Sequence, residues 1–200
     1  MPRLIDHDER DRQIAEASMR VLARDGLAGL SVRHVAAEAG IATASLRRAF
    51  PEQDALRRFC LEHIRLSATR RIQGVRGEGR PAVLAVLEEL LPLDEERRIE
   101  LTAHLQLGAL ALSSEQLRPV LLQFNEGIRE LCAGLIAELD RVGELRPGAD
   151  RTVEADRLHA LVDGVALHLL WDGGPGEREQ ERERERAVAV LTAHLDGLRG

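Results

Sequence analysis

Residues 31–51 read SVRHVAAEAGIATASLRRAFP, and this stretch decides the fold of the first part of the chain. Ser31 occupies the N-cap position of a short helix predicted over residues 32–38, because a serine hydroxyl accepts backbone N–H bonds there. Gly40 follows where a tight turn needs a positive φ. A second short helix is predicted over residues 43–50. Two short helices joined in this way form a helix-turn-helix, whose second helix enters the major groove of DNA.

The apolar residues of this stretch are placed to hold its two helices together. Val35, Ile41 and Leu46 fall where the two helices share a core, and Ala36 is small enough for them to cross closely. Any corner between two helices can produce the same pattern, however. The spacing alone therefore does not establish DNA binding.

Helical periodicity extends to both sides of residues 31–51, and no strand alternation appears. A first helix is predicted over residues 9–24, with Gly26 at its C-cap, and a long helix begins near Asp54. The charged run EREQERERER at residues 177–186 fits either a solvated helix start or a disordered hinge. The other predicted helices cover residues 82–91, 94–112, 117–142, 152–171 and the segment that begins within the charged run. The fold class is therefore all-α, with about nine helices.

Glycines and a proline between residues 74 and 81 mark a joint between two predicted domains. The first is a three-helix domain at residues 8–68, with its helix-turn-helix motif at 32–51, and the second is a helical domain at residues 80–200. The first 80 residues carry 15 arginines against 11 acidic residues, a net charge of +4, while the rest carries −10. A basic module on an acidic body suits nucleic-acid binding, although random clustering of charge gives the same picture.

The composition is that of a globular protein, with 44% apolar and 31% charged residues. No run approaches the ~20 apolar residues of a membrane span, and the first residues lack the apolar segment of a secretory signal. We therefore expect a cytoplasmic protein that does not engage a membrane. Aromatic residues make up 2% of the chain, which argues against single-strand binding by base stacking. Cys60 and Cys132 fit small buried hydrophobes; a redox pair is the unsupported alternative.

Residues 13–56 resemble the N-terminal DNA-binding domain of the TetR/AcrR family of bacterial transcriptional regulators. The resemblance rests on four stretches in order at the family's spacing: ARDGL at 23–27, LSVRHVA at 30–36, AGIA at 39–42 and SLRRAFP at 45–51. A weaker similarity links LVDGVAL at 161–167 to the corresponding helix of BetI-like members. The rest of the chain matches only in layout, as a variable helical regulatory domain of the expected size.

The resemblance implies which residues contact double-stranded DNA at a near-palindromic operator. They are Ser31, Arg33, Thr43, Ala44, Ser45, Arg47, Arg48 and Gln53. The sequence departs from the family pattern at Arg47 and Ala49, where many members carry aromatic residues, and at Gln53, where lysine is common. These departures leave the operator sequence and the affinity open. Arg10 or Arg12 could compensate for the lost contacts.

Two late helices have more apolar surface than one packed face needs, so the sequence also predicts a homodimer. The predicted interface consists of Leu158, Val162, Val165, Leu169, Val188, Leu191, Leu195 and Leu198. A helix as apolar as residues 152–171 should be buried once against its own chain and once against another chain.

The resemblance further implies that a small molecule enters the second domain and changes the spacing of the two DNA-binding domains. Polar or aromatic residues on otherwise apolar faces are the candidates for its pocket. They are His63, His104, Gln106, Phe124, Asn125, His168 and Trp171. Each also fits a core or interface residue. The mostly aliphatic interior favours a hydrophobic effector.

No motif predicts catalysis, a cofactor or a metal site. His159 and Asp163 lie four residues apart, but no third ligand follows at a defining spacing. A phosphate-binding glycine loop and a nucleophile elbow are likewise missing. The sequence therefore favours a one-component regulator, a repressor that a ligand releases. An activator, a regulator without effector, and a dimeric binding protein whose DNA-binding domain has decayed remain as alternatives.

Overall fold

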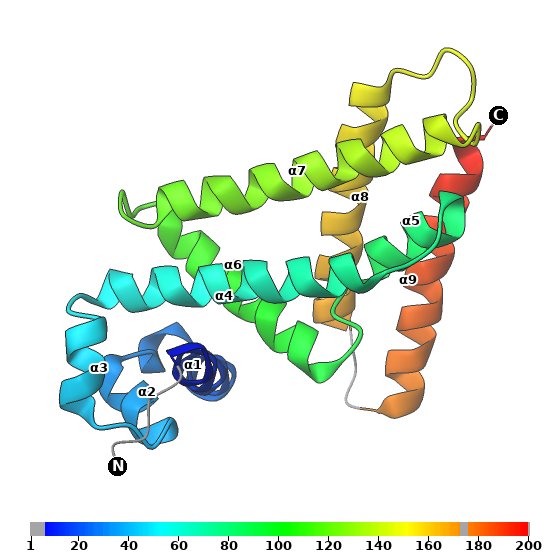
Figure 1. The fold of residues 1–200 in the computed structure, drawn as a ribbon. Coiled ribbons are helices and arrows are strands. Elements are labelled where there is room, and N and C mark those ends of the chain that lie inside the picture. Colours follow the sequence, from blue (N-terminus) through cyan, green and yellow to red (C-terminus); the bar gives the residue numbers. More distant parts are fainter. Residues whose placement is uncertain (1–6, 173–175, 200) are drawn as a thin grey trace. The chain divides into compact units, whose positions relative to one another are not determined.

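The computed structural model describes residues 7–172 and 176–199, which form nine α-helices and no strand (Figure 1). The all-α prediction is confirmed. The helices are α1 His7–Gly29, α2 Val32–Glu38, α3 Thr43–Ala49, α4 Gln53–Gly74, α5 Gly79–Glu88, α6 Glu95–Ala111, α7 Arg118–Arg141, α8 Arg151–Asp172 and α9 Glu177–Gly197. Within these residues, no helix has the length and apolar content that a membrane span requires.

The chain divides into two compact units that do not follow chain order. The first contains residues 1–66 and 99–122, and the second contains residues 67–98 and 123–200. Helices α4, α6 and α7 therefore each contribute to both units. The domain boundary expected near residues 68–80 stays a prediction.

The start of the first unit follows the local signals in the sequence. The backbone of Gly26 (φ 65°, ψ −168°) is not helical, so the predicted helix end appears as a kink inside α1. Ser31 has an extended backbone, and its Oγ accepts a hydrogen bond from the backbone N–H of His34 at 3.2 Å. This cap satisfies one of the free N–H groups at the start of α2, as predicted.

The core of the first unit is formed by apolar side chains from α1, α3 and α4. Each of five large residues is at most 2% exposed: Ile14, Leu22, Leu46, Leu56 and Leu61. Leu46 is the inward-facing side chain of α3 and fixes the rotation of that seven-residue helix. An isolated helix this short is unstable in water, so α3 exists because its apolar side packs on this core.

In the second unit, α9 packs against both α8 and α5. Large side chains from four of its helices are fully buried: Leu87, Ile136, Leu139, Leu158 and Leu191. The charged run at residues 177–186 is the start of α9 and not a hinge, and its described side chains are mostly exposed.

Candidate nucleic-acid interface

The turn between α2 and α3 is closed by backbone hydrogen bonds around Gly40. Gly40 has φ +65°, the left-handed conformation that glycine adopts without steric cost. Its N–H donates to the carbonyl of Ala37 at 3.3 Å, and the N–H of Ile41 donates to the carbonyl of Ala36 at 2.9 Å. This pair of bonds is a Schellman motif, which ends α2 and directs the chain into α3.

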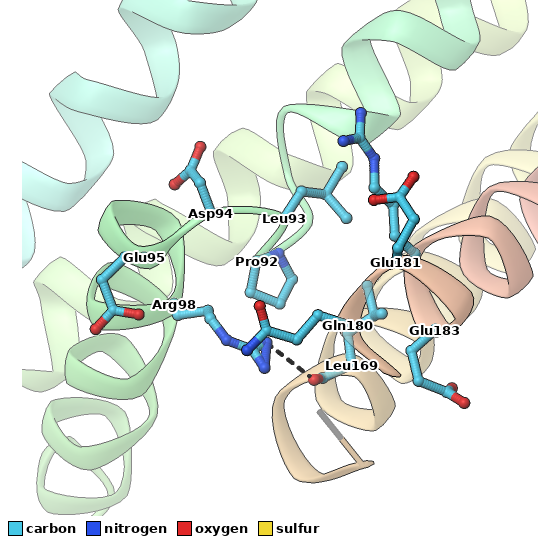
Figure 2. Close-up of a pocket in the computed structure, with 10 residues that line it drawn as sticks. Pro92, Leu93, Asp94, Glu95, Arg98, Leu169, Gln180, Glu181 and Glu183 are labelled. Atoms are coloured by element: carbon cyan, nitrogen blue, oxygen red, sulfur yellow. Dashed lines mark hydrogen bonds between the residues drawn. The ribbon is translucent and has the colours of Figure 1, made fainter. Parts of the chain in front are cut away.

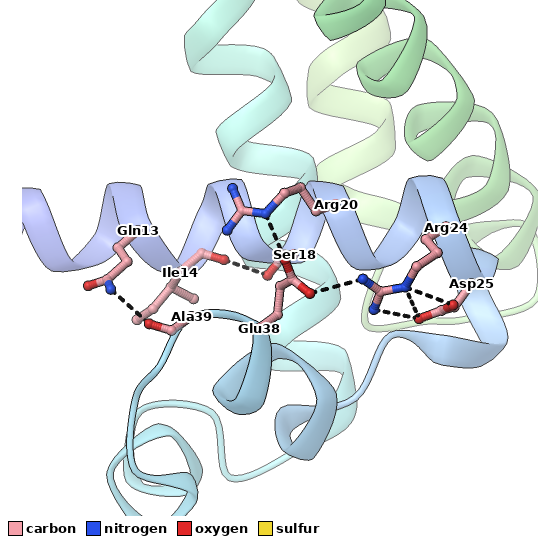
Figure 3. Close-up of polar contacts among 8 residues, drawn as sticks. All are labelled: Gln13, Ile14, Ser18, Arg20, Arg24, Asp25, Glu38 and Ala39. Carbon is pink, nitrogen blue, oxygen red and sulfur yellow. Dashed lines mark hydrogen bonds and ion pairs between the residues drawn. The ribbon is translucent and has the colours of Figure 1, made fainter.

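Polar side chains of α1 hold the turn in place (Figure 3). Gln13 Nε2 donates to the backbone carbonyl of Ala39 at 2.7 Å. At the end of α2, Glu38 accepts from Arg20 Nε at 2.8 Å and from Arg24 Nη1 at 3.0 Å. These hydrogen bonds lower the pKa of the Glu38 carboxyl group, first through Arg20 and then through Arg24. Two cations thus offset a carboxylate that the C-terminal end of a helix disfavours.

Helix α3, the second helix of the helix-turn-helix, has an exposed side. Leu46 is buried and Thr43 is half-buried, whereas Ala44, Arg47 and Arg48 are exposed. Ala44, Arg47 and Arg48 have i, i+3, i+4 spacing, which places them on one side of the helix. A small residue beside two arginines leaves room for this side to approach a base edge.

The arginines between residues 7 and 58 differ in their partners. Four on α1 and α4 pair with carboxylates: Arg12, Arg20, Arg24 and Arg57. The half-buried Arg10 and Arg58 form no ion pair with a described residue. Arg33, Arg47 and Arg48 are exposed and likewise form no ion pair with any described residue. Between residues 7 and 58, the exposed arginines without an ion pair therefore all lie on α2 and α3.

Two other predicted contact residues are engaged within the unit. Arg10 Nη2 donates a hydrogen bond to Ser45 Oγ at 2.8 Å. The Gln53 side chain donates to the carbonyl of Leu30, so it ties the start of α4 to the residue before α2. The side chain of Gln53 is therefore engaged within the unit, and the start of α4 can hold a phosphate only through backbone N–H groups.

Comparison with known protein families shows to which family the chain belongs. Residues 14–58 match the family model for bacterial regulatory proteins of the tetR family, and residues 79–200 match the model for the C-terminal part of BetI-type transcriptional repressors. The chain belongs to the TetR family. It is therefore a transcriptional regulator with a helix-turn-helix DNA-binding domain, and the family is not a family of enzymes.

Relatives of this TetR-family chain align over most of its length. The HTH-type transcriptional regulator PksA of Bacillus subtilis (strain 168) is 37% identical over 175 residues, which cover 86% of this chain and 84% of PksA. A solved transcriptional regulator from Rhodococcus sp. Rha1 is 29% identical with a TM-score of 0.72, over 93% of this chain and 97% of the other. The multidrug binding protein EbrR, solved in complex with malachite green, is 27% identical with a TM-score of 0.66, over 93% and 98%.

The second unit of this TetR-family protein has an apolar groove along α8 and α9. Its volume is about 270 Å³, and Leu161 and Val165 of α8 and Ala187 and Val190 of α9 contribute its apolar lining. Val190 is 40% exposed. An exposed groove of this kind on two packed helices is a surface on which a second chain can dock.

The residues predicted for the dimer interface differ in their burial within one protomer. Six of the eight residues are buried within the protomer itself: Leu158, Val162, Leu169, Leu191, Leu195 and Leu198. Three of them lie on α8 and three on α9 or at its C-cap, and these two helices pack against each other within one chain. Only Val165 and Val188 keep a half-exposed surface. The apolar periodicity correctly indicated a buried face, but it could not tell which chain buries it.

The residues predicted to line one effector pocket divide between the two units. His63, His104 and Gln106 belong to the first unit, and burial lowers the pKa of His104 to about 4. Phe124, Asn125, His168 and Trp171 belong to the second unit. Trp171 is 70% exposed in the protomer. Asn125 is exposed as well, and His168 lines the groove along α8 and α9.

A second cavity of about 290 Å³ lies among the α5–α6 connection, the end of α8 and the start of α9 (Figure 2). Pro92, Leu93 and Leu169 give it an apolar side, and Glu181 is one of four carboxylates around it. Arg98 reaches across and donates from Nη1 to the carbonyl of Leu169 at 3.2 Å. None of the seven residues predicted for a pocket lines this cavity.

Sequence reasoning missed residues whose role depends on a partner in space. Leu161 and Val190 line the groove but were not among the residues predicted for the dimer interface. The i, i+4 spacing of Leu161 and Val165 indicates a second apolar side of α8. Arg10 was considered only as a substitute DNA contact. Its bond to Ser45 joins residues 35 positions apart and has no local signature.

Proposed function

We propose that this TetR-family regulator is a homodimeric repressor of the bacterial cytoplasm that binds a near-palindromic operator and leaves it when a small-molecule effector binds. The observation that carries the proposal is the uncompensated charge of Arg33, Arg47 and Arg48 on α2 and α3. The other exposed arginines between residues 7 and 58, which are Arg12, Arg20 and Arg24, pair with carboxylates. Exposed cations without partners are suited to phosphates and to guanine, which accepts two hydrogen bonds from one arginine.

The test is binding to the DNA upstream of the protein's own gene, measured by fluorescence anisotropy over a salt series. Wild type is compared with Arg47→Ala, Arg48→Ala and the control Arg182→Ala, which removes an exposed arginine from α9. A lost phosphate contact lowers the slope of log K against log[salt] by about 0.9 for each protomer, hence by about 2 for a dimer. A lost guanine contact instead costs about 1–3 kcal/mol at each half-site and relaxes the preference for one base.

Each outcome decides a separate part of the proposal. Steep, sequence-selective binding by wild type and by Arg182→Ala, with losses in the two α3 variants, supports it. Unchanged affinity and slope in both α3 variants removes them from the interface. Weak binding by wild type that is indifferent to sequence and salt overturns DNA reading altogether.

The homodimer is proposed on the groove along α8 and α9. A two-fold interface uses the same surface on both copies, and helices that present an apolar groove meet this condition. Two DNA-binding domains held in this way can match two half-sites on one face of the duplex, so dimerisation and operator symmetry support each other.

Val190→Glu tests the dimer without disturbing the protomer, because Val190 is 40% exposed. Val153→Glu is the matched control, since Val153 is 43% exposed on α8 and does not line the groove. We expect Val190→Glu to halve the mass in analytical ultracentrifugation, while Val153→Glu stays dimeric. Equal masses in both variants would place the interface elsewhere. Leu169 is unsuitable, because a charge at this buried position destabilises the protomer itself.

For the effector we propose a small molecule with a substantial apolar body. The aliphatic core of the second unit and the solved complex of EbrR with malachite green support this choice. Malachite green serves as the probe: it should bind this chain and weaken operator binding, and operator DNA should weaken dye binding by the same factor. Dye binding that leaves the affinity for DNA unchanged would exclude this dye as an effector, because it would show equal affinity for both states.

A further inference from the structure

Arg10 at the start of α1 reaches the recognition helix of the same unit. Its Nη2 lies 2.8 Å from Ser45 Oγ, and the hydrogen bond spans 35 positions of the sequence. Arg12, two residues further on, is instead held by the carboxylates of Glu9 and Glu16 on its own helix. The charge of Arg10 is therefore directed at α3.

The chemistry of this contact fixes the role that the Ser45 hydroxyl can play. A serine hydroxyl has one proton to donate and two lone pairs to accept with, whereas a guanidinium group only donates. In the bond to Arg10, Oγ of Ser45 is therefore the acceptor, and its proton is left over. Among the described residues no acceptor takes that proton. The adjacent positive charge also polarises the hydroxyl and strengthens it as a donor.

We propose that Arg10 is a positioning residue that makes Ser45 a hydrogen-bond donor, so that Ser45 selects an acceptor atom on a base edge of the operator. This inference rests on the proposed function, because it takes α3 to be the helix in the major groove. Ser45 is the third residue of α3, and the N-terminal residues of a recognition helix are those that contact base edges.

The base that faces Ser45 is expected to carry a hydrogen-bond acceptor on its major-groove edge. In the major groove, guanine offers N7 and O6, adenine offers N7 and thymine offers O4 as acceptors, whereas the cytosine N4 and adenine N6 amino groups are donors. A hydroxyl that accepted from DNA would choose the amino groups. With one lone pair engaged by Arg10 and the proton free, Ser45 favours the acceptors instead.

The experiment is a complete set of base-pair substitutions in one operator half-site, measured by fluorescence anisotropy. It compares wild type, Ser45→Ala, Arg10→Met and the double variant, with Arg12→Met as the control that removes the neighbouring charge from the same helix. We expect wild type to prefer guanine or thymine over cytosine at one position by roughly 3- to 10-fold, the worth of one net hydrogen bond. Both single variants should lose this preference, and the double variant should lose no more than either.

The readout separates positioning from other roles of Arg10. If Arg10 contacts a phosphate, Arg10→Met weakens binding to every sequence alike, lowers the salt slope by about 1 per protomer and adds to the effect of Ser45→Ala. That result overturns the inference, as does a preference for an amino group opposite Ser45 or a loss of preference in Arg12→Met. If wild type shows no sequence preference at all, the proposed function fails and the inference falls with it. Additive variants on a sequence-selective wild type defeat the inference alone. Unfolding midpoints of all variants confirm that each is folded.

Discussion

Replacing Gly40 by alanine measures how much the stability of the protein depends on the left-handed backbone of the turn between α2 and α3. Gly40 has φ +65°, and a Cβ atom built on it meets nothing within 4 Å. The added methyl group therefore causes no clash with other residues, and its whole cost lies in the left-handed backbone. That conformation costs an L-residue about 1–2 kcal/mol. Alanine also reduces the conformational entropy of the unfolded chain, which stabilises the folded state by about 0.4–1 kcal/mol. We expect a net loss of about 1 kcal/mol.

Gly108→Ala is the matched control within the same unit. Gly108 lies inside α6, and the nearest atom to its added Cβ is Leu121 Cδ1 at 3.5 Å, an ordinary contact. Here alanine is the better helix former by about 0.8–1 kcal/mol, so the same chemical change should stabilise. Gly40→Asn should fall between wild type and Gly40→Ala, because asparagine tolerates the left-handed region.

The assay is thermal unfolding followed by far-ultraviolet circular dichroism at one fixed protein concentration, since the Tm of the proposed dimer depends on concentration. For a chain of this size, 1 kcal/mol shifts Tm by about 2–4 °C. We expect Gly40→Ala to lower Tm by this amount and Gly108→Ala to raise it by a similar amount. A neutral or stabilising Gly40→Ala, or equal losses for alanine and asparagine, would show that the turn does not depend on left-handed backbone.

Three further predictions concern the core, the pH dependence of stability and the thiols. Leu46→Ala removes a side chain with 0% exposure, should cost about 2–5 kcal/mol and should abolish operator binding near room temperature, as seen by denaturant unfolding and anisotropy. The pKa of Glu138 is lowered from 4.5 to about 2 by its hydrogen bond with Arg141, so its stabilising effect is complete above pH 4.5 and is lost as the pH falls towards 2. Glu138→Gln should therefore reduce the dependence of the unfolding midpoint on pH between pH 4.5 and 2, and should not change that dependence at higher pH. Burial raises the pKa of Cys60 to about 12 and that of Cys132 to about 11, so both thiols should resist a disulfide reagent at neutral pH until denaturant is added.

The local features of the DNA-binding part could be predicted because each has a short-range cause. The cap at Ser31, the left-handed Gly40 and the inward-facing Leu46 follow from residue type and spacing within one or two helical turns. The predicted bounds 32–38 coincide with α2, and the predicted helix over 43–50 exceeds α3 by one residue. Such features survive any tertiary arrangement that keeps the two helices together.

The contacts that could not be predicted join distant parts of the chain. Glu38 sits at the wrong end of a helix for its charge, and only the structure shows that Arg20 and Arg24 of α1 compensate it. An apolar stripe such as Leu158 and Leu169 shows that a face is buried, whereas the identity of the covering surface depends on how α8 and α9 pack. For the same reason, polar residues on apolar stripes did not predict which of them share a pocket.

Two helices of seven residues each lie far below the roughly 12–15 residues at which isolated helices become stable, so α2 and α3 depend entirely on caps, turn and core. Those supports use the inner side of α3, whereas Ala44, Arg47 and Arg48 lie on the outer side and support nothing within the protomer. Substitution of these exposed residues can therefore change which operator sequence is bound without destabilising the fold. Ser45 is the exception. Its hydroxyl oxygen accepts a hydrogen bond from Arg10 within the protomer, and in our proposal its proton is donated to DNA. A change at Ser45 should thus alter specificity and the contact with α1 together, while a change at Arg48 alters binding alone.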